Sequence, residues 1–303
     1  LTWPGAGSPT ALTLRFTAER ARGTITIAVG DDGAGIAWDA IRRKAAKAGL
    51  PAQPVMLAAA VACYRAWMAE TGLAPALVAG HSLGEYSALV AAGSLTLADA
   101  LPLVRFRAQA MQEAVPVGVG AMAAILGLDS EVVRVTCAEV AAAVGEPVEA
   151  ANFNDPKQIV IAGTKGAVDQ ACEALKGRGA KRALPLAVSA PFHSSLMKPA
   201  AERLQERLLS VTLRTPAIPL VNNIDVAVQT DPDAIREALY RQAFGPVRWV
   251  EVVQAIRARG ATHLFECGPG KVLAGLAKRI DASLVVGNVL DPATLAEAKG
   301  MLQ

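Results

Sequence analysis

A serine in a glycine-flanked turn is the side chain of this sequence best suited to covalent chemistry. Ser82 is the middle residue of the segment 80–84, Gly-His-Ser-Leu-Gly, which lies between an apolar run at 73–79 and a helical pattern at 85–92. In such G-x-S-x-G turns the serine projects from a strained bend between a strand and a helix. The pattern predicts a nucleophile whose oxyanion receives the N–H of Leu83 at the helix start. The alternative is an ordinary strand-to-helix turn without chemistry.

A serine hydroxyl needs a base to become nucleophilic, and the chain has three histidines. His81 adjoins Ser82 on the turn, so we expect its ring to point away. His263 lies in a predicted strand and is interpreted as structural. His193 lies in the loop 189–195 between a predicted strand and a helix, where active-site residues tend to collect. His193 is therefore the candidate base.

The elements that position these groups follow from apolar spacing and turn residues. Helices are predicted at 54–70, 85–92, 97–114, 131–144, 167–178, 197–209, 232–243, 248–258 and 271–279, and strands at 73–79, 121–126, 148–152, 158–162, 182–188, 218–222 and 262–266. Alternating strands and helices predict a mostly parallel sheet.

The predicted order of elements also divides the chain. Between about 119 and 188 the order strand-helix-strand-strand-helix-strand predicts a ferredoxin-like subdomain. We therefore expect an α/β fold whose α/β-hydrolase-like, parallel-sheet core comprises 1–118 and 189–303 and carries the smaller subdomain, 119–188, as an insertion.

Composition excludes several classes of protein. The 303 residues are 52% apolar, which is enough for a large core, and no apolar run approaches the length of a membrane span. The net charge of +3 comes without a basic block, so we expect no nucleic-acid partner. The four cysteines and three histidines lack metal-ligand spacing, and we expect reduced thiols, no metal, no cofactor and a cytoplasmic location. The first residues resemble the end of a strand, and no signal-peptide pattern is present.

The segment 80–89, Gly-His-Ser-Leu-Gly-Glu-Tyr-Ser-Ala-Leu, closely resembles the malonyl-CoA:acyl carrier protein transacylases of bacteria. Further matches to this acyltransferase family run in order along the chain: 120–124, 152–154, 158–163, 180–186, His193, 196–199, 221–223 and 268–273. The resemblance covers about 52 to 290 almost without gaps, and it is far more specific than the serine turn alone.

The resemblance implies a role for particular residues. Ser82 would accept the malonyl group from coenzyme A as an ester, and His193 would serve as base and then as acid. The family orients this histidine with a backbone carbonyl, which maps to Gln242. Arg107 matches the arginine that holds the malonyl carboxylate, a task that suits a planar guanidinium. Asn154 matches an asparagine lining the site, with a simple turn residue as the alternative.

The resemblance also implies substrates and partners. Phe192, just before the candidate base, matches an aromatic position that accompanies malonyl choice in related polyketide acyltransferases, because its bulk crowds a branching methyl group. A pocket discriminates one methyl group by only about 1–3 kcal/mol, so the preference need not be absolute. The implied partners are malonyl-CoA and an acyl carrier protein, in fatty-acid or polyketide synthesis, and the implied oligomeric state is a monomer.

The first fifty residues depart from the family. Ala6 stands where the family has a glutamine beside the oxyanion; its backbone N–H can still donate. Residues 11–50 instead resemble the ATP-binding segment of chemotaxis-type histidine kinases, with a strand-like stretch at 24–29 and Asp-Asp-Gly-Ala-Gly-Ile at 31–36. A genuine insertion or fusion, a misassigned stretch of sequence and an accidental similarity are the open explanations, and replacement or misassignment is favoured over a working nucleotide site.

Two other functions compete with malonyl transfer. The serine turn also occurs in esterases and thioesterases, but a hydrolase of neutral esters gains nothing from a buried cation at Arg107. A kinase-derived nucleotide-binding module would rest on 31–36 alone.

Overall fold

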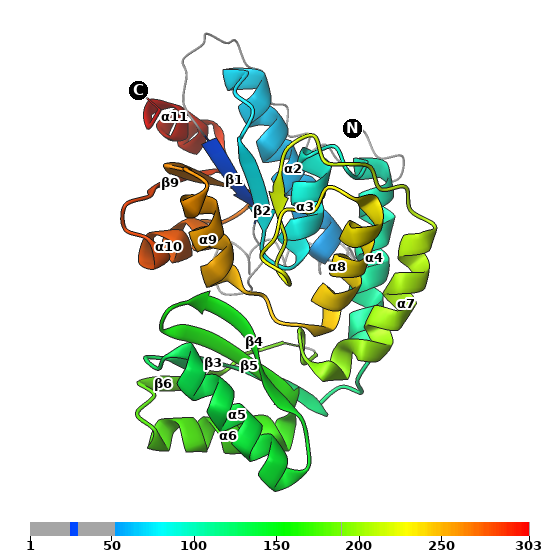
Figure 1. The fold of residues 1–303 in the computed structure, drawn as a ribbon, viewed down its shortest axis with the longest axis vertical. Coiled ribbons are helices and arrows are strands. Elements are labelled where there is room, and N and C mark those ends of the chain that lie inside the picture. Colours follow the sequence, from blue (N-terminus) through cyan, green and yellow to red (C-terminus); the bar gives the residue numbers. More distant parts are fainter. Residues whose placement is uncertain (1–24, 30–51, 189, 303) are drawn as a thin grey trace, which may run out of the picture.

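The computed structural model describes the backbone of residues 25–29 and residues 52–188 and 190–302 in full; Ala6 and most of the kinase-like stretch lie outside this range. A five-stranded parallel sheet forms the centre of the larger unit (Figure 1). Its strands, in spatial order, are β7 (Leu220–Val221), β2 (Leu77–Gly80), β1 (Ile25–Val29), β8 (His263–Cys267) and β9 (Val285–Val289). The strand predicted at 24–29 is thus confirmed for its described residues and lies in the middle of the sheet.

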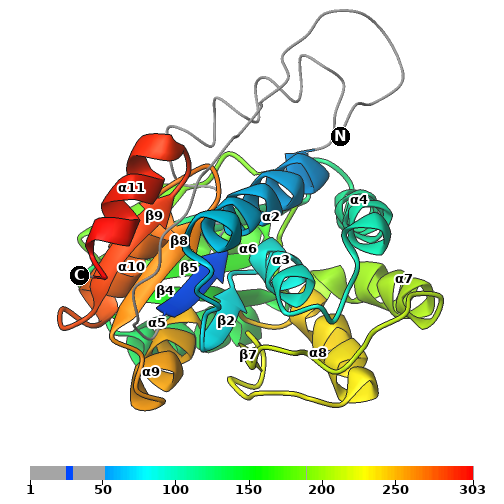
Figure 2. The ribbon, with the colours of Figure 1, turned by 90° about the horizontal axis from the view of Figure 1, so that it is seen from above.

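Helices cover both faces of this sheet because its strands are apolar on both sides. In β2, Val78 faces one core while Leu77 and Ala79 face the other. The first core is shared with α2 (Ala52–Thr71), α3 (Leu83–Ala91), α4 (Leu97–Glu113), α7 (Lys198–Leu209), α8 (Pro232–Phe244) and α11 (Pro292–Gly300). The second core contains α9 (Trp249–Ala258) and α10 (Val272–Ile280), and Figure 2 shows α9 and α11 on opposite sides of the sheet.

A smaller antiparallel sheet lies below this unit in Figure 1. Its strand order is β4 (Val148–Asp155), β5 (Gln158–Thr164), β3 (Gly120–Leu126) and β6 (Arg182–Pro185). Its outer face packs on α5 (Ser130–Val144) and α6 (Lys165–Gly177).

The two units are joined through backbone as well as side chains. The N–H of Phe153 in β4 donates to the carbonyl oxygen of Val247 at 2.9 Å, and the N–H of Val247 donates to Ala151 at 2.9 Å. Val247 lies between α8 and α9, so the segment that follows α8 is fixed to the small sheet. This joint matters because His193 contacts the same segment, as described below.

Three predicted strands are shorter in the structure than the sequence suggested, and the one at 218–222 is reduced to Leu220–Val221. The strand at 73–79 begins only at Leu77, because Leu73 is bonded to the end of α2: its N–H donates to Thr71 and its carbonyl accepts from the indole of Trp67. The strand at 182–188 ends at Pro185, after which Leu186 and Val188 turn to pack on the inner face of the small sheet.

The sequence reading missed β9 and α11. Gly287 and Asn288 interrupt the apolar pattern of β9, and both residue types are unfavourable in strands. For α11 a signal was present: Asp291 and Thr294 form a capping box at the helix start, and Pro292 lies between them at the first helical position. Among the described helices, none is both long and apolar enough to cross a membrane.

The close packing of the small sheet generates a stability prediction. A Cβ at Gly163 in β5 would lie 2.1 Å from the carbonyl oxygen of Pro147, whereas a Cβ at Gly177 at the end of α6 meets nothing within 4 Å. We expect Gly163→Ala to lower the free energy of unfolding by about 1–3 kcal/mol, because the backbone must shift. Gly177→Ala, the control, should leave it unchanged or raise it slightly. Urea denaturation followed by circular dichroism measures both, and equal midpoints would contradict the prediction.

Candidate active site

The serine turn is held by a close approach of two backbone segments. β2 ends at Gly80 and α3 begins at Leu83, so the chain reverses within two residues. A Cβ at Gly80 would lie 1.9 Å from the carbonyl carbon of Gly84, which explains the glycine. Ser82 has φ 52° and ψ −107°, a conformation that L-residues rarely adopt and that costs on the order of 1–3 kcal/mol. The turn therefore has the geometry expected of a nucleophile elbow.

Asn223 stabilises this strained turn from both sides. Its Oδ1 accepts the N–H of Ser82 at 2.7 Å, and its Nδ2 donates to the carbonyl oxygen of Gly80 at 2.7 Å. Asn223 follows β7 and is fully buried. One side chain thus satisfies a main-chain donor and a main-chain acceptor of the buried turn.

His193 lies against the nucleophile. Its Nε2 is 2.7 Å from the Oγ of Ser82, while its Nδ1 is 2.9 Å from the carbonyl oxygen of Gln242 and 3.2 Å from that of Gly245. Carbonyl oxygens only accept, so Nδ1 carries the proton and Nε2 is left as the acceptor for the serine hydroxyl. His193 itself has φ 60°, so its loop also pays backbone strain to aim the ring.

The surroundings of His193 keep its ring neutral. Burial first, and the nearby positive charge of Arg107 second, lower the pKa of His193 from 6.5 to about 3, although the two carbonyl hydrogen bonds oppose the shift. The neutral form is the one able to accept a proton from Ser82.

Arg107 projects from α4 into the same site. It is 1% exposed, and its Nη2 donates to the Oγ of Ser82 at 3.0 Å and to Oε1 of Gln242 at 3.3 Å. Its Nη1 donates to Oε1 of Gln53 at 3.1 Å, and the guanidinium lies 5.5 Å from the ring centre of Tyr86. These contacts place a buried cation next to the nucleophile, and the acceptors it meets there are neutral.

Glu85 is a buried acid that the sequence reading missed. It lies one helical turn after Ser82, is 2% exposed, and its Oε2 accepts the N–H of Asn223 at 2.9 Å and Nε2 of Gln242 at 3.0 Å. Burial raises the pKa of Glu85 to about 7, opposed by the hydrogen bonds from Gln242 and Asn223 and by the charge of Arg107. A charged residue inside the otherwise apolar helix 85–92 was the available signal.

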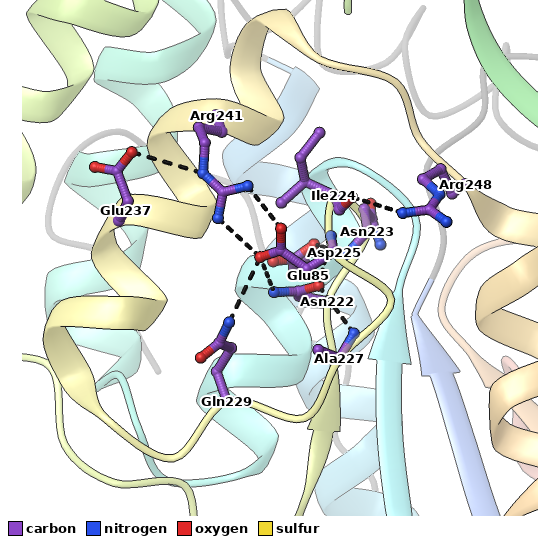
Figure 3. A network of polar contacts seen from close by, with 10 residues as sticks. All are labelled: Glu85, Asn222, Asn223, Ile224, Asp225, Ala227, Gln229, Glu237, Arg241 and Arg248. Atoms are coloured by element: carbon purple, nitrogen blue, oxygen red, sulfur yellow. Dashed lines mark hydrogen bonds and ion pairs between the residues drawn. The ribbon is translucent and has the colours of Figure 1, made fainter.

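The loop that carries Asn223 is anchored to α8 (Figure 3). Asp225 accepts two hydrogen bonds from Arg241 in α8, at 2.6 and 2.8 Å, and one from Nδ2 of Asn222 at 3.2 Å. Arg241 immediately precedes Gln242. The anchor therefore sets Asn223 and Gln242 side by side, where both reach Glu85 (Figure 3 shows Glu85 next to this loop).

The remaining predicted residues occupy different places. Leu83 is the first residue of α3, so its N–H has no acceptor in its own helix. Oδ1 of Asn154, in β4, accepts a hydrogen bond from Nε2 of His81 at 2.8 Å. This bond links the small sheet to the serine turn, and it shows that the ring of His81 points away from Ser82. Phe192 is half-buried between the large core and the inner face of the small sheet. Ala6 lies outside the described residues.

Metal sites and reactive thiols are the other chemical groups considered among the described residues. No group of three or more histidine, cysteine, aspartate or glutamate side chains among them could hold a metal ion. The four cysteines are free thiols, and burial raises the pKa of Cys63 to about 11 and that of Cys137 to about 12. These thiols are not activated as nucleophiles.

Comparison with known proteins places the chain in a family of acyl transferases. The model of the acyl transferase domain family matches residues 49–279. The malonyl CoA-acyl carrier protein transacylase of Escherichia coli (strain K12) is 53% identical over 246 residues, which are 81% of this chain and 79% of the relative. The crystal structure of the acyl-carrier-protein S-malonyltransferase of Burkholderia pseudomallei 1710b is 55% identical, with a TM-score of 0.84, over 91% of this chain and 99% of that one.

A third relative was solved with its partner: a malonyl-transacylase in complex with its type II polyketide acyl carrier protein is 43% identical, with a TM-score of 0.83, over 91% of this chain and 99% of that one. The family model covers more than half of this chain and ends well beyond the candidate base. The chain belongs to the acyl transferase domain family and, within it, to the malonyl-CoA:acyl carrier protein transacylases.

Proposed function

We propose that this protein transfers a malonyl group from malonyl-CoA to the phosphopantetheine thiol of an acyl carrier protein, through an ester on Ser82. The observation that carries the proposal is the buried cation of Arg107 beside a serine–histidine pair: its Nη2 is 3.0 Å from the Oγ of Ser82. An acyl group that ends in a carboxylate can form an ion pair there, whereas an uncharged acyl group cannot. The named relatives act on malonyl-CoA and acyl carrier protein, which supports this choice.

The first half-reaction loads the enzyme. Ser82 Oγ attacks the thioester carbonyl of malonyl-CoA while Nε2 of His193, 2.7 Å away, takes the hydroxyl proton. The C–O bond forms and the carbonyl electrons move onto oxygen; when they return, the C–S bond breaks. His193 then gives its proton to the departing coenzyme A thiolate, which leaves a malonyl ester on Ser82 and a neutral imidazole.

The second half-reaction reverses these roles. His193 removes the proton of the carrier protein's thiol, and the thiolate attacks the ester carbonyl so that a C–S bond forms and the carbonyl electrons move onto oxygen. When these electrons return, the C–O bond to Ser82 breaks. The proton returns from His193 to Oγ of Ser82. The Nδ1–H of His193 donates to Gln242 throughout, so this carbonyl oxygen stabilises the imidazolium that forms in each half.

The oxyanion of each tetrahedral intermediate lies beside the start of α3. The N–H of Leu83 and the positive end of the helix dipole favour negative charge at this point, and one such donor lowers a barrier by roughly 3–4 kcal/mol. Ala6 remains the predicted second donor. Asn154 and Phe192 remain predicted wall residues, and the bond from His81 to Asn154 supports a place for Asn154 at the edge of the site.

We further propose the finer description of the fold. The strand–elbow–helix arrangement and the parallel sheet support an α/β-hydrolase-like core, 1–118 and 189–303. The antiparallel order β4-β5-β3-β6 with two helices on one face supports a ferredoxin-like insertion, 119–188. Fatty-acid or polyketide synthesis in the cytoplasm is the setting that fits these partners.

Labelling tests the proposed function directly. The protein is mixed with radiolabelled malonyl-CoA, quenched and digested, and the label should appear on the peptide that contains Ser82 and be absent from Ser82→Ala. Adding holo acyl carrier protein should then move the label to the carrier. Rapid release of free malonate without carrier would instead support a hydrolase.

Arg107 should determine the preference for a carboxylate-bearing acyl group. We expect Arg107→Ala to lower kcat/KM for malonyl-CoA by about 10- to 100-fold, since charge-assisted hydrogen bonds contribute about 1.5–3 kcal/mol, and to lower acetyl transfer far less. Arg105→Ala is the matched control, because Arg105 lies on the same helix and is exposed. Equal loss for both acyl groups would remove this role from Arg107.

The neutral state of His193 predicts a pH dependence. Because the folded pKa is about 3 and the ordinary value is 6.5, the imidazole should stay neutral down to pH 5, and its ¹⁵N ring signals, assigned with His193→Ala, should not titrate between pH 8 and 5. Stability contributed by the neutral ring is complete above pH 6.5 and is lost as the pH falls towards 3. A titration midpoint near 6.5 would contradict the burial that the structure shows.

A further inference from the structure

We propose that Glu85 is a positioning residue. One of its carboxylate oxygens holds Asn223, which supports the turn of Ser82, and Gln242, whose carbonyl oxygen orients His193. The positioning role rests on the proposed function only in the choice of malonyl-CoA as the natural substrate of the site. It concerns the alignment of Ser82 with His193, which any reagent that attacks Ser82 can report.

The geometry gives Glu85 two distinct partners. Its Oε2 accepts hydrogen bonds from Nε2 of Gln242, which is 157 positions away in the chain, and from the backbone N–H of Asn223, which is 138 positions away. These partners come from α8 and from the loop after β7, whereas Glu85 lies on α3. One oxygen thus joins three segments that meet at the site.

Each partner of Glu85 in turn holds a reacting group. Gln242 accepts Nδ1–H of His193 with its carbonyl oxygen, and its Nε2 also donates to the carbonyl oxygen of Ser82 at 3.1 Å. Asn223 bonds to Ser82 and Gly80 on either side of the strained turn. Loss of the Glu85 carboxylate would therefore remove one hydrogen bond from Gln242 and one from Asn223 at the same time.

The position of Glu85 on the first turn of α3 makes this link stiff. The N–H of Glu85 donates to the carbonyl oxygen of Ser82 at 3.1 Å, so the carboxyl group is tied to the nucleophile by one helical hydrogen bond. The donors that Glu85 accepts are buried, and buried donors without partners are costly. The site therefore depends on Glu85 to keep Ser82 Oγ and His193 Nε2 at hydrogen-bonding distance.

A merely structural role predicts a different outcome from a positioning role. If Glu85 only stabilised the fold, its loss would reduce the number of folded molecules and leave each folded site as fast as before. If Glu85 positions the site, folded sites become slow although they remain folded. The rate per titrated site separates these two cases.

The test uses Glu85→Met, which keeps the length of the side chain and removes the acceptor oxygen, together with Gln242→Met, which removes the side-chain partner and keeps the carbonyl oxygen that His193 needs. Two rates are measured per titrated site: acylation of Ser82 by saturating malonyl-CoA, and sulfonylation of Ser82 by phenylmethylsulfonyl fluoride. The second rate needs the serine–histidine pair and no malonyl group.

We expect Glu85→Met to lower both rates by about 10-fold or more, with a change in KM for malonyl-CoA below about threefold. The double variant should be about as slow as the slower single variant, because both changes break the same Glu85–Gln242 contact. Unchanged rates per site, or a double variant slowed by the product of the single effects, would overturn the proposal. A parent protein that reacts with the sulfonyl fluoride but not with malonyl-CoA would overturn the proposed function alone.

Glu266→Met is the matched control. Glu266 is also a buried glutamate, 4% exposed, and its Oε2 accepts the N–H of Ala274 at 2.9 Å at the start of α10. Its substitution should lower the unfolding midpoint without changing either rate per site. If Glu266→Met slowed both rates as much as Glu85→Met does, the effect would be general weakening of the fold, and the positioning role of Glu85 would be wrong.

Discussion

The close approach of Gly80 to Gly84 is the constraint on which the site depends. It lets β2 pass directly into α3, and it forces Ser82 into a backbone conformation with φ 52°. Such strain persists only where the surroundings over-determine it. Here Asn223 supplies two hydrogen bonds to the turn, and Glu85 holds Asn223. The nucleophile is therefore fixed by backbone geometry first and by side chains second.

Burial of charge explains the chemistry that this turn supports. His193 and Glu85 both respond to burial by a pKa shift that favours the neutral form, whereas an arginine guanidinium stays charged in proteins. Arg107 thus keeps its charge in the site while its acceptors, Ser82, Gln242 and Gln53, are all neutral. The same cation lowers the pKa of His193, so the group that would bind a carboxylate also keeps the base in its reactive form.

The sequence could propose the reacting groups but not the residues that support them. Ser82 and His193 could be proposed because a glycine-flanked turn and a loop histidine are local patterns, and Arg107 because a family resemblance pointed to it; the structure brings both His193 and Arg107 within hydrogen-bonding distance of Ser82. Glu85 could not be assigned a role, since its partners lie 138 and 157 positions away and only tertiary packing brings them together.

The same distinction between local pattern and tertiary context holds for the fold. The nine helices predicted from apolar spacing have bounds that agree with the structure within a few residues, whereas α11 was not predicted. β9 contains Gly287 and Asn288 and is specified by its pairing with β8, which no local pattern reports. β4 extends beyond its predicted end because two register shifts let it continue beside β5 to Asp155.

β1 shows why a segment unlike the family can still complete the fold. A central parallel strand must supply backbone hydrogen bonds on both edges, and the residues of β1, Ile-Thr-Ile-Ala-Val, are mostly β-branched, as strands favour. The register sets Val29 beside Gly80, so β1 ends next to the serine turn, and it begins, at Ile25, at the opposite end of the parallel strands. The N–H of Leu83, at the start of α3 beside this end of β1, is therefore the oxyanion donor that the described part of the chain supports.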